Sequence, residues 1–267
     1  MAEVAVSGIT ALGGWGIARV EALGGMASLA WSGLAAGGRQ ILRGRPRVRE
    51  CLEQIETCGV SSLGVVLFSV VFTTMMMAVE MSYHVRMVLQ QDSLVPAFST
   101  ILFTREIGPV VTCLLLASRV GAGMAAEIAL MKDTEQLDVL RLLRIDLSDF
   151  LLVPRWVGAT VSAVGVVLCS LVVSFVASAY LAAPQIGYTP GEYWNSMMLL
   201  THGADLWGAV LKAAVFGSII ALVSVQAGLA AGRGSRGVGG ASTSAVVRAS
   251  VLIIAADLVL TSLLYAV

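Results

Sequence analysis

The chain has 267 residues, of which 57% are hydrophobic and only 13% are charged, and its formal net charge is zero. Soluble domains carry about 25% charged residues, so this composition, with a mean hydropathy of +0.87, predicts an all-α integral membrane protein. No basic, aromatic-rich surface suggests nucleic-acid binding. Neither the cysteines nor the histidines have the spacing of a metal site or of a catalytic triad: Cys51, Cys58, Cys113, Cys169, His84 and His202.

The N-terminal region, residues 1–45, lacks the basic start and compact apolar core of a signal peptide. Between Glu21 and Arg39 stand only 17 uncharged residues, several of them glycine, which is short for a span of about 20 residues. We therefore expect an amphipathic interfacial or re-entrant helix here. An ordinary membrane span is the alternative.

Charge-poor runs predict about five transmembrane helices in the remaining core, residues 46–267. They cover residues 57–79, 93–131, 156 to about 184, 213–232 and 249–267. A polar, aromatic loop with the sequence GYTPGEYWNS is expected after the third run. No internal repeat or separate soluble domain is visible, so the chain is expected to form one membrane domain.

Lysine and arginine in the connecting loops predict the orientation of the chain. Twelve basic residues flank alternate loops, and the opposite set of loops holds only Arg86. The basic set is expected to be cytoplasmic. The N-terminus is then cytoplasmic, and the C-terminus and residues 180–203 lie on the outer side.

Four charged residues fall inside the predicted spans: Arg105, Glu106, Lys212 and Asp257. At 1.5 Å per residue they lie about 16, 9 and 13 Å from the outer ends of the second, fourth and fifth spans. Charges at this depth are costly and usually functional. Two readings remain open, because the charges cancel: ion pairs that join helices, or a polar cavity for an amphipathic substrate.

The second span carries two further patterns. Pro109 cannot donate a hydrogen bond to the carbonyl of Arg105, so a kink is expected beside the charged pair. Small residues repeat every four positions below it, which predicts close helix packing: Ala117, Gly121, Ala125 and Ala129. Arg119 and Glu127 are expected to be packing or cytoplasmic-side residues.

Residues 133–144 read as a short cytoplasmic helix. Asp133 can cap it, with Gln136 three residues later, and Leu137, Leu140 and Leu143 form an apolar stripe. The helix is either a surface connector or a coupling helix held by a nucleotide-binding partner.

A GxGxxG pattern at residues 232–237 lacks the strand and soluble βαβ unit that dinucleotide binding requires, so a tight turn is expected there. No GxxxxGK[ST] sequence occurs, so the chain has no P-loop of its own for ATP.

From about Gln54 to Leu264 the chain resembles the MlaE (YrbE) permease family of MCE-associated ABC lipid transporters. Three segments carry the resemblance: TREIGPVVTCLLLASRVGAGMAAEIALMKDTEQLDVL, LLVPR, and the stretch from DLWGAVLK to LTSLL. The resemblance implies a homodimeric inner-membrane permease subunit that performs no catalysis. It would move phospholipid or related lipids between the inner membrane and a periplasmic MCE-type carrier, and so maintain the lipid balance of the outer membrane.

The resemblance also implies roles for particular residues. Lipid contact is expected at Arg105, Glu106, Lys212, Asp257, Val71 and Val79. Docking of a cytoplasmic ABC ATPase, which would hold the ATP and magnesium, is expected at Glu135, Gln136, Leu137, Asp138 and Leu140. This chain itself is expected to need no cofactor or metal. The alternative function is a non-transporting scaffold that anchors an MCE-type protein.

Overall fold

The computed structural model describes residues 28, 31–32, 48–89 and 94–265. The regular secondary structure of these residues is helical throughout, without a strand. Within the described part of the chain, five segments are long and apolar enough to cross a membrane: Val48–Met87, Val95–Asp133, Ser148–Ile186, Gly203–Leu229 and Gly234–Tyr265. The predicted all-α membrane fold is therefore confirmed. The N-terminal interfacial helix lies almost entirely outside the described residues and stays a prediction.

The first two segments are built from α-helices joined by single π-helical turns. The first comprises α2 (Val48–Ile55), the π turn η1 (Glu56–Val60) and α3 (Ser61–Leu89). The second comprises α4 (Val95–Leu102), η3 (Phe103–Ile107), α5 (Gly108–Leu116), η4 (Ala117–Gly121) and α6 (Ala122–Asp133), with π turns at η3 and η4. The π turn η3 holds the charged pair just before Pro109, where the sequence predicted a kink.

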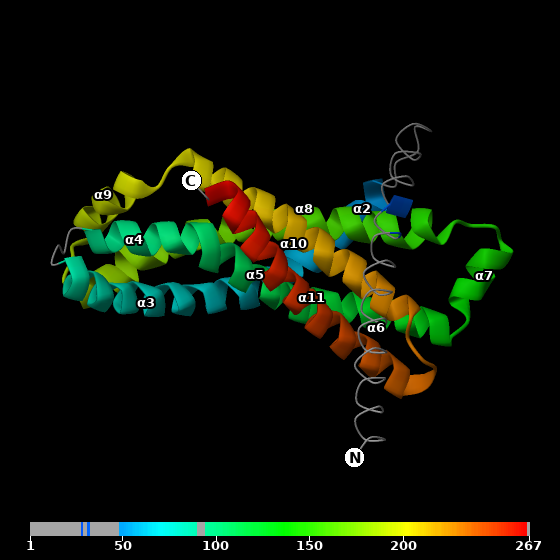
Figure 1. The fold of residues 1–267 in the computed structure, drawn as a ribbon. Helices are drawn as coiled ribbons and strands as arrows, with labels where there is room; N and C mark the ends of the chain where they lie inside the picture. Colours follow the sequence, from blue (N-terminus) through cyan, green and yellow to red (C-terminus); the bar gives the residue numbers. More distant parts are fainter. Residues whose placement is uncertain (1–27, 29–30, 33–47, 90–93, 266–267) are drawn as a thin grey trace, which may run out of the picture.

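The last three segments complete the bundle. The third comprises the π turn η5 (Ser148–Leu152), α8 (Val153–Ala177), the π turn η6 (Ser178–Ala182) and the 3₁₀ turn η7 (Ala183–Ile186). The fourth is α10 (Gly203–Leu229) and the fifth is α11 (Gly234–Tyr265). Helix α10 packs against α8, α11 and α6 and is the most buried span, whereas α11 crosses the face of the bundle and is the least buried (Figure 1).

The expected loop after the third span is wrong in one respect, because residues Pro190–Leu200 form helix α9. Its N-terminus is a capping box: the Thr189 hydroxyl accepts a hydrogen bond from the Glu192 amide at 3.3 Å, and the Glu192 carboxylate accepts one from the Thr189 amide at 3.0 Å. Pro190 occupies the first helical position, where proline is favoured. Buried Tyr193 then fixes α9 to α4 through a 3.0 Å hydrogen bond with Ser99.

The short helix α7 (Gln136–Leu142) lies at the end of the molecule opposite α9 (Figure 1). The predicted cap at Asp133 is wrong. Asp133 ends α6, and the residue before α7 is Glu135, which has a left-handed backbone with φ 60° and makes no capping hydrogen bond. The carboxylate of Asp133 instead accepts a hydrogen bond from the amide of Gly234 in α11.

The predicted stripe of small residues is confirmed as a packing surface. Ala125 packs with Ala227 and Ala245, and Ala129 packs one turn further on with Ala231 and Ala241. The match between α6 and α10 is so close that a Cβ atom on Gly228 would lie 2.7 Å from Ile128. Residues 230–233 join α10 to α11, so the expected turn at residues 232–237 is correct only at its start, because Gly234 and Gly237 already belong to α11.

Candidate functional site

Three of the four intramembrane charges predicted from the sequence, Glu106, Lys212 and Asp257, meet at the side chain of Lys212, which has no solvent-exposed surface. Its ammonium nitrogen lies 2.7 Å from Asp257 Oδ1 and 3.1 Å from Glu106 Oε1. These two carboxylates come from α11 and η3, and the lysine from α10. Three spans are therefore joined at one buried cation.

Two neutral oxygens complete the surroundings of this ammonium group. The Lys212 ammonium donates to the Arg105 carbonyl at 2.8 Å and to the Thr261 hydroxyl at 2.7 Å, and Thr261 in turn donates to Glu106 at 2.9 Å. An ammonium group has three protons to donate. With four oxygens within 3.1 Å, Lys212 has no unused hydrogen-bonding capacity in this arrangement.

The sequence Gly108-Pro109 explains why the Arg105 carbonyl faces the lysine. In a continuous α-helix this carbonyl would accept from the amide of residue 109, but proline has none. Gly108 is also required, because a Cβ atom there would lie 2.8 Å from the Phe103 carbonyl and 2.9 Å from its ring. The backbone of the second span thus supplies one of the oxygens around Lys212.

Arg105 is held by a different carboxylate, that of Asp205. The Arg105 Nε atom donates to Asp205 Oδ1 at 2.6 Å, and the Tyr265 ring lies 4.5 Å from the guanidinium carbon. Asp205 is itself buried, and its other oxygen accepts from the His202 amide at 2.9 Å at the start of α10. Arg105 keeps 35% of its side chain exposed, whereas Lys212 exposes none, so Arg105 is the accessible one of the two cations.

Asp205, Thr261 and Tyr265 were not predicted from the sequence. Asp205 stands between the predicted outer loop, which ended at residue 203, and the charge-poor run counted from residue 213, and it was given no role. A signal was present, since Asp205 precedes Lys212 by seven residues, which places both side chains on one face of a helix. With Asp205 included, two cations face three carboxylates, so the formal charges no longer cancel.

The two apolar candidates, Val71 and Val79, lie on α3 and apart from the charged cluster. Val71 is half-buried, whereas Val79 is 43% exposed and lines an open pocket of about 500 Å³. The other residues of this pocket are Ser82, Tyr83, Arg86, Met87, Gln185 and Ile186. The structure therefore does not bring the valines and the charges into one site within a single chain.

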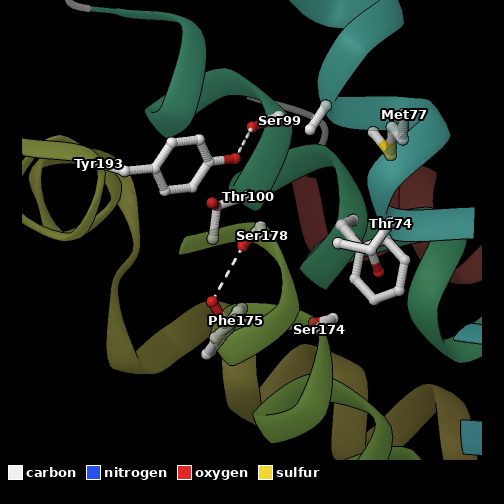
Figure 2. A pocket seen from close by; sticks show the side chains of 10 residues that line it. Thr74, Met77, Ser99, Thr100, Ser174, Phe175, Ser178 and Tyr193 are labelled. Atoms are coloured by element: carbon white, nitrogen blue, oxygen red, sulfur yellow. Dashed lines mark hydrogen bonds between the residues drawn. The ribbon is translucent and has the colours of Figure 1, made fainter. Parts of the chain in front are cut away.

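A second, smaller pocket lies between α3, α4, α8 and α9 and the π turns η3 and η6 (Figure 2). Its walls are rich in hydroxyl groups, which come from Thr74, Ser99, Thr100, Ser174, Ser178 and Tyr193. Its volume of about 10 Å³ is close to the least that one water molecule requires. The pocket is therefore too small for a lipid headgroup.

The predicted docking residues divide into two groups on α7. Glu135, Gln136 and Asp138 are exposed at the end of the molecule, and Asp138 pairs with Arg141 at 2.9 Å. Leu137 is only 3% exposed and Leu140 is half-buried. Leu137 and Leu140 thus lie toward the bundle, whereas Val139 and Leu142 are exposed on α7 together with the polar docking residues.

The remaining two charges of the second span have structural partners, as expected. Arg119 donates to the carbonyl of Ser61 in α3. Glu127 pairs with buried Arg155 of α8 at 2.7 Å. Both contacts join neighbouring spans away from the cluster around Lys212.

Comparison with known proteins shows to which family this chain belongs. The family Permease MlaE matches residues 51–263. A probable ABC transporter permease of Rickettsia typhi is 34% identical over 216 residues, which cover 81% of this chain and 83% of that protein. A probable ABC transporter permease of Synechocystis is 31% identical, with 84% and 85% of the two chains covered.

A plant protein is similar to the same extent. The chloroplastic protein TRIGALACTOSYLDIACYLGLYCEROL 1 of Arabidopsis thaliana is 33% identical over 227 residues, which cover 85% of this chain and 64% of that protein. The region that matches the family includes all the charged residues around Lys212 and the helix α7. The chain belongs to the MlaE permease family of ABC transporter permeases.

Proposed function

We propose that this protein is the membrane subunit of a transporter that moves phospholipid or related lipids between the inner membrane and a periplasmic MCE-type carrier. It would act as a homodimer, with ATP hydrolysis in a separate ABC ATPase, and would maintain the lipid balance of the outer membrane. Family membership supports the permease class. The plant relative, whose name contains a diacylglycerol glycolipid, supports a lipid substrate.

The observation that carries this proposal is the accessible guanidinium group of Arg105 beside a buried charge cluster. Its Nε atom is held by Asp205, so the outer nitrogens of the fork remain for a ligand. Arginine can bind two phosphate oxygens at once. Lys212, in contrast, exposes no surface, and its geometry favours a role in holding the three spans together.

The charge balance of the cluster narrows the substrate class. Two cations face three carboxylates, and both Glu106 and Asp257 keep part of their side chains exposed, 27% and 18%. A purely anionic headgroup would add to this excess of negative charge. A zwitterionic headgroup would place its phosphate at Arg105 and its ammonium near the carboxylates, and is the better electrostatic fit.

The transfer of a labelled lipid from liposomes that hold the complete transporter tests this function. Arg105→Ala is expected to reduce transfer strongly, and a matched substitution in α11, Arg248→Ala, is expected to leave it unchanged. ATP hydrolysis that does not respond to lipid, together with no transfer by the unaltered complex, would favour the non-transporting scaffold instead.

Glu135 and the polar residues of α7 are proposed to bind the ATPase, with α7 and the N-terminus in the cytoplasm and the C-terminus in the periplasm. Glu135→Lys and Asp138→Lys should each weaken ATPase binding, because both side chains face outward. Co-purification of the ATPase with the altered membrane subunit measures this. Undiminished binding in both variants would rule out docking through these residues.

A further inference from the structure

Two side chains at the corner between α6 and α7, formed by residues 132–135, bind the ends of two other spans. Lys132 and Asp133, the last two residues of α6, stand just before the two-residue turn that leads into α7. Their side chains reach the turn between α10 and α11, which lies at the same end of the molecule (Figure 1). The helix that faces the ATPase is thus joined to α10 and α11 through neighbouring side chains.

Lys132 binds the carboxyl end of α10. Its ammonium nitrogen donates to the carbonyl oxygens of Leu229 and Ala231, both at 2.8 Å. The last carbonyls of a helix have no partner within the helix, and a cation is favoured at this end by the helix dipole. Lys132 therefore satisfies acceptors that α10 cannot satisfy itself.

Asp133 binds the amino end of α11 in the complementary way. Its Oδ1 atom accepts a hydrogen bond from the amide of Gly234, the first residue of α11, at 2.7 Å. The first amides of a helix also lack internal partners, and an anion is favoured there. Adjacent residues of opposite charge thus bind helix ends of opposite polarity.

The same three spans are joined again at a second place, inside the bundle. Lys212 of α10, Asp257 of α11 and Glu106 of the second span meet in the charged cluster, about 26 Å along α10 from Leu229 at 1.5 Å per residue. Between the two junctions, the alanine contacts of α6 with α10 and α11 are close-packed. These close contacts leave little room for α6, α10 and α11 to shift against one another between the two junctions.

We propose that Lys132 and Asp133 form a corner latch that couples movement of α7 to the charged cluster around Lys212. They are positioning residues: they touch neither lipid nor nucleotide, and act by making α10 and α11 follow α7. A cleft of about 220 Å³ lies between α7 and the α10–α11 turn, and Lys132 and Asp133 line it. The hydrogen bonds of these two residues reach across this corner to the ends of α10 and α11. The inference rests on the proposed function for its partner, an ATPase that docks on α7.

The test uses the complete transporter with two double variants. One carries Lys132→Ala and Asp133→Ala together, and the other carries Lys132→Arg and Asp133→Asn together. Lys132→Arg keeps donors for the α10 carbonyls, and Asp133→Asn keeps an acceptor for the Gly234 amide. The alanine double variant is expected to bind the ATPase and hydrolyse ATP, while the lipid transferred per ATP falls at least about fivefold, within the usual range of coupling between sites. The conservative double variant should stay within about twofold of the unaltered complex.

A second readout does not depend on lipid. In a background that carries Cys51→Ser and Cys169→Ser, a cysteine introduced by Ser262→Cys reports the exposure of α11 beside the cluster, since Ser262 is exposed. ATP should change its labelling rate in the unaltered latch and in the conservative variant, but not in the alanine variant.

The outcomes separate the two proposals. If the unaltered complex transfers no lipid but its labelling still depends on ATP through the latch, then the latch stands and the lipid function fails. The latch is overturned if the alanine variant keeps normal transfer and labelling, if it no longer binds the ATPase, or if ATP changes the labelling of no variant.

Discussion

The buried ammonium of Lys212 allows the sharpest test of the charged cluster. Lys212→Met keeps most of the side-chain volume but leaves Glu106 and Asp257 without the cation that lies 3.1 and 2.7 Å from them. Removal of one member of a buried ion pair typically costs about 3–5 kcal/mol. For a chain of this size this corresponds to a fall in melting temperature of about 6–20 °C.

A second change should restore most of this loss. In Lys212→Met with Asp257→Asn, one of the two unpaired carboxylates is gone, and Glu106 keeps its 2.9 Å hydrogen bond from Thr261. Replacement of a whole buried pair by neutral residues of similar size is often close to neutral. We therefore expect the double variant to recover more than half of the lost stability.

Thermal unfolding in detergent and lipid transfer in liposomes are measured on the same two variants. Because Lys212 exposes no surface, its role is expected to be structural, and transfer should return together with stability. A double variant that folds as well as the unaltered protein and still transfers no lipid would refute this reasoning. It would show that the ammonium group itself contacts the headgroup.

The other predictions concern single sites. Pro109→Ala supplies an amide that competes with the buried lysine for the Arg105 carbonyl. Although alanine is the better helix former, the variant should lose about 1 kcal/mol of unfolding free energy and melt at a lower temperature; a more stable variant would contradict this. Gly228→Ala should destabilise by about 1–3 kcal/mol, because its Cβ would lie 2.7 and 2.9 Å from atoms of α6; an unchanged melting temperature would show that α6 and α10 can separate freely. Hydrogen bonds from Thr189 lower the pKa of Glu192, so this capping box stabilises the folded state above the ordinary carboxyl pKa and stops doing so as the pH falls through the lowered value. Glu192→Gln should therefore flatten the acid side of a plot of stability against pH, and an identical acid limb in the variant would disprove the capping role.

The charged cluster could be predicted from the sequence because charges inside apolar runs are visible without a structure. Arg105, Glu106, Lys212 and Asp257 stand out in this way, and helix geometry places them at similar depth. Which charge pairs with which could not be predicted. That choice depends on side-chain direction across three helices, and it gives Arg105 a partner that was not considered.

Helix ends were harder to predict than helices. Asp133 has the side chain of a capping residue, but its carboxylate is used by Gly234, which is 101 residues away in the chain. The capping box of Thr189 and Glu192 was visible in the sequence, yet this polar and aromatic stretch was interpreted as a loop. A capping side chain therefore determines the end of its own helix only where no distant group binds it: Thr189 caps α9, whereas Asp133 binds Gly234 instead of capping α7.

The order of the charges along the chain has a consequence for biogenesis. Arg105 and Glu106 are adjacent, so the second span brings both signs into the membrane together. The fourth span brings Lys212 with Asp205, and only then does the last span deliver Asp257 to a lysine already in place. An unaccompanied charge at a helix centre costs about 2.5–3.5 kcal/mol during insertion. A chain that ends before α11 should therefore still insert α10 into the membrane. Glu106→Gln in that shortened chain should lower the fraction of molecules in which α10 is inserted. Equal insertion of α10 in the shortened chain and in its variant would argue against this sequence of events. During synthesis, every ionised side chain of the cluster thus arrives beside a partner of opposite sign.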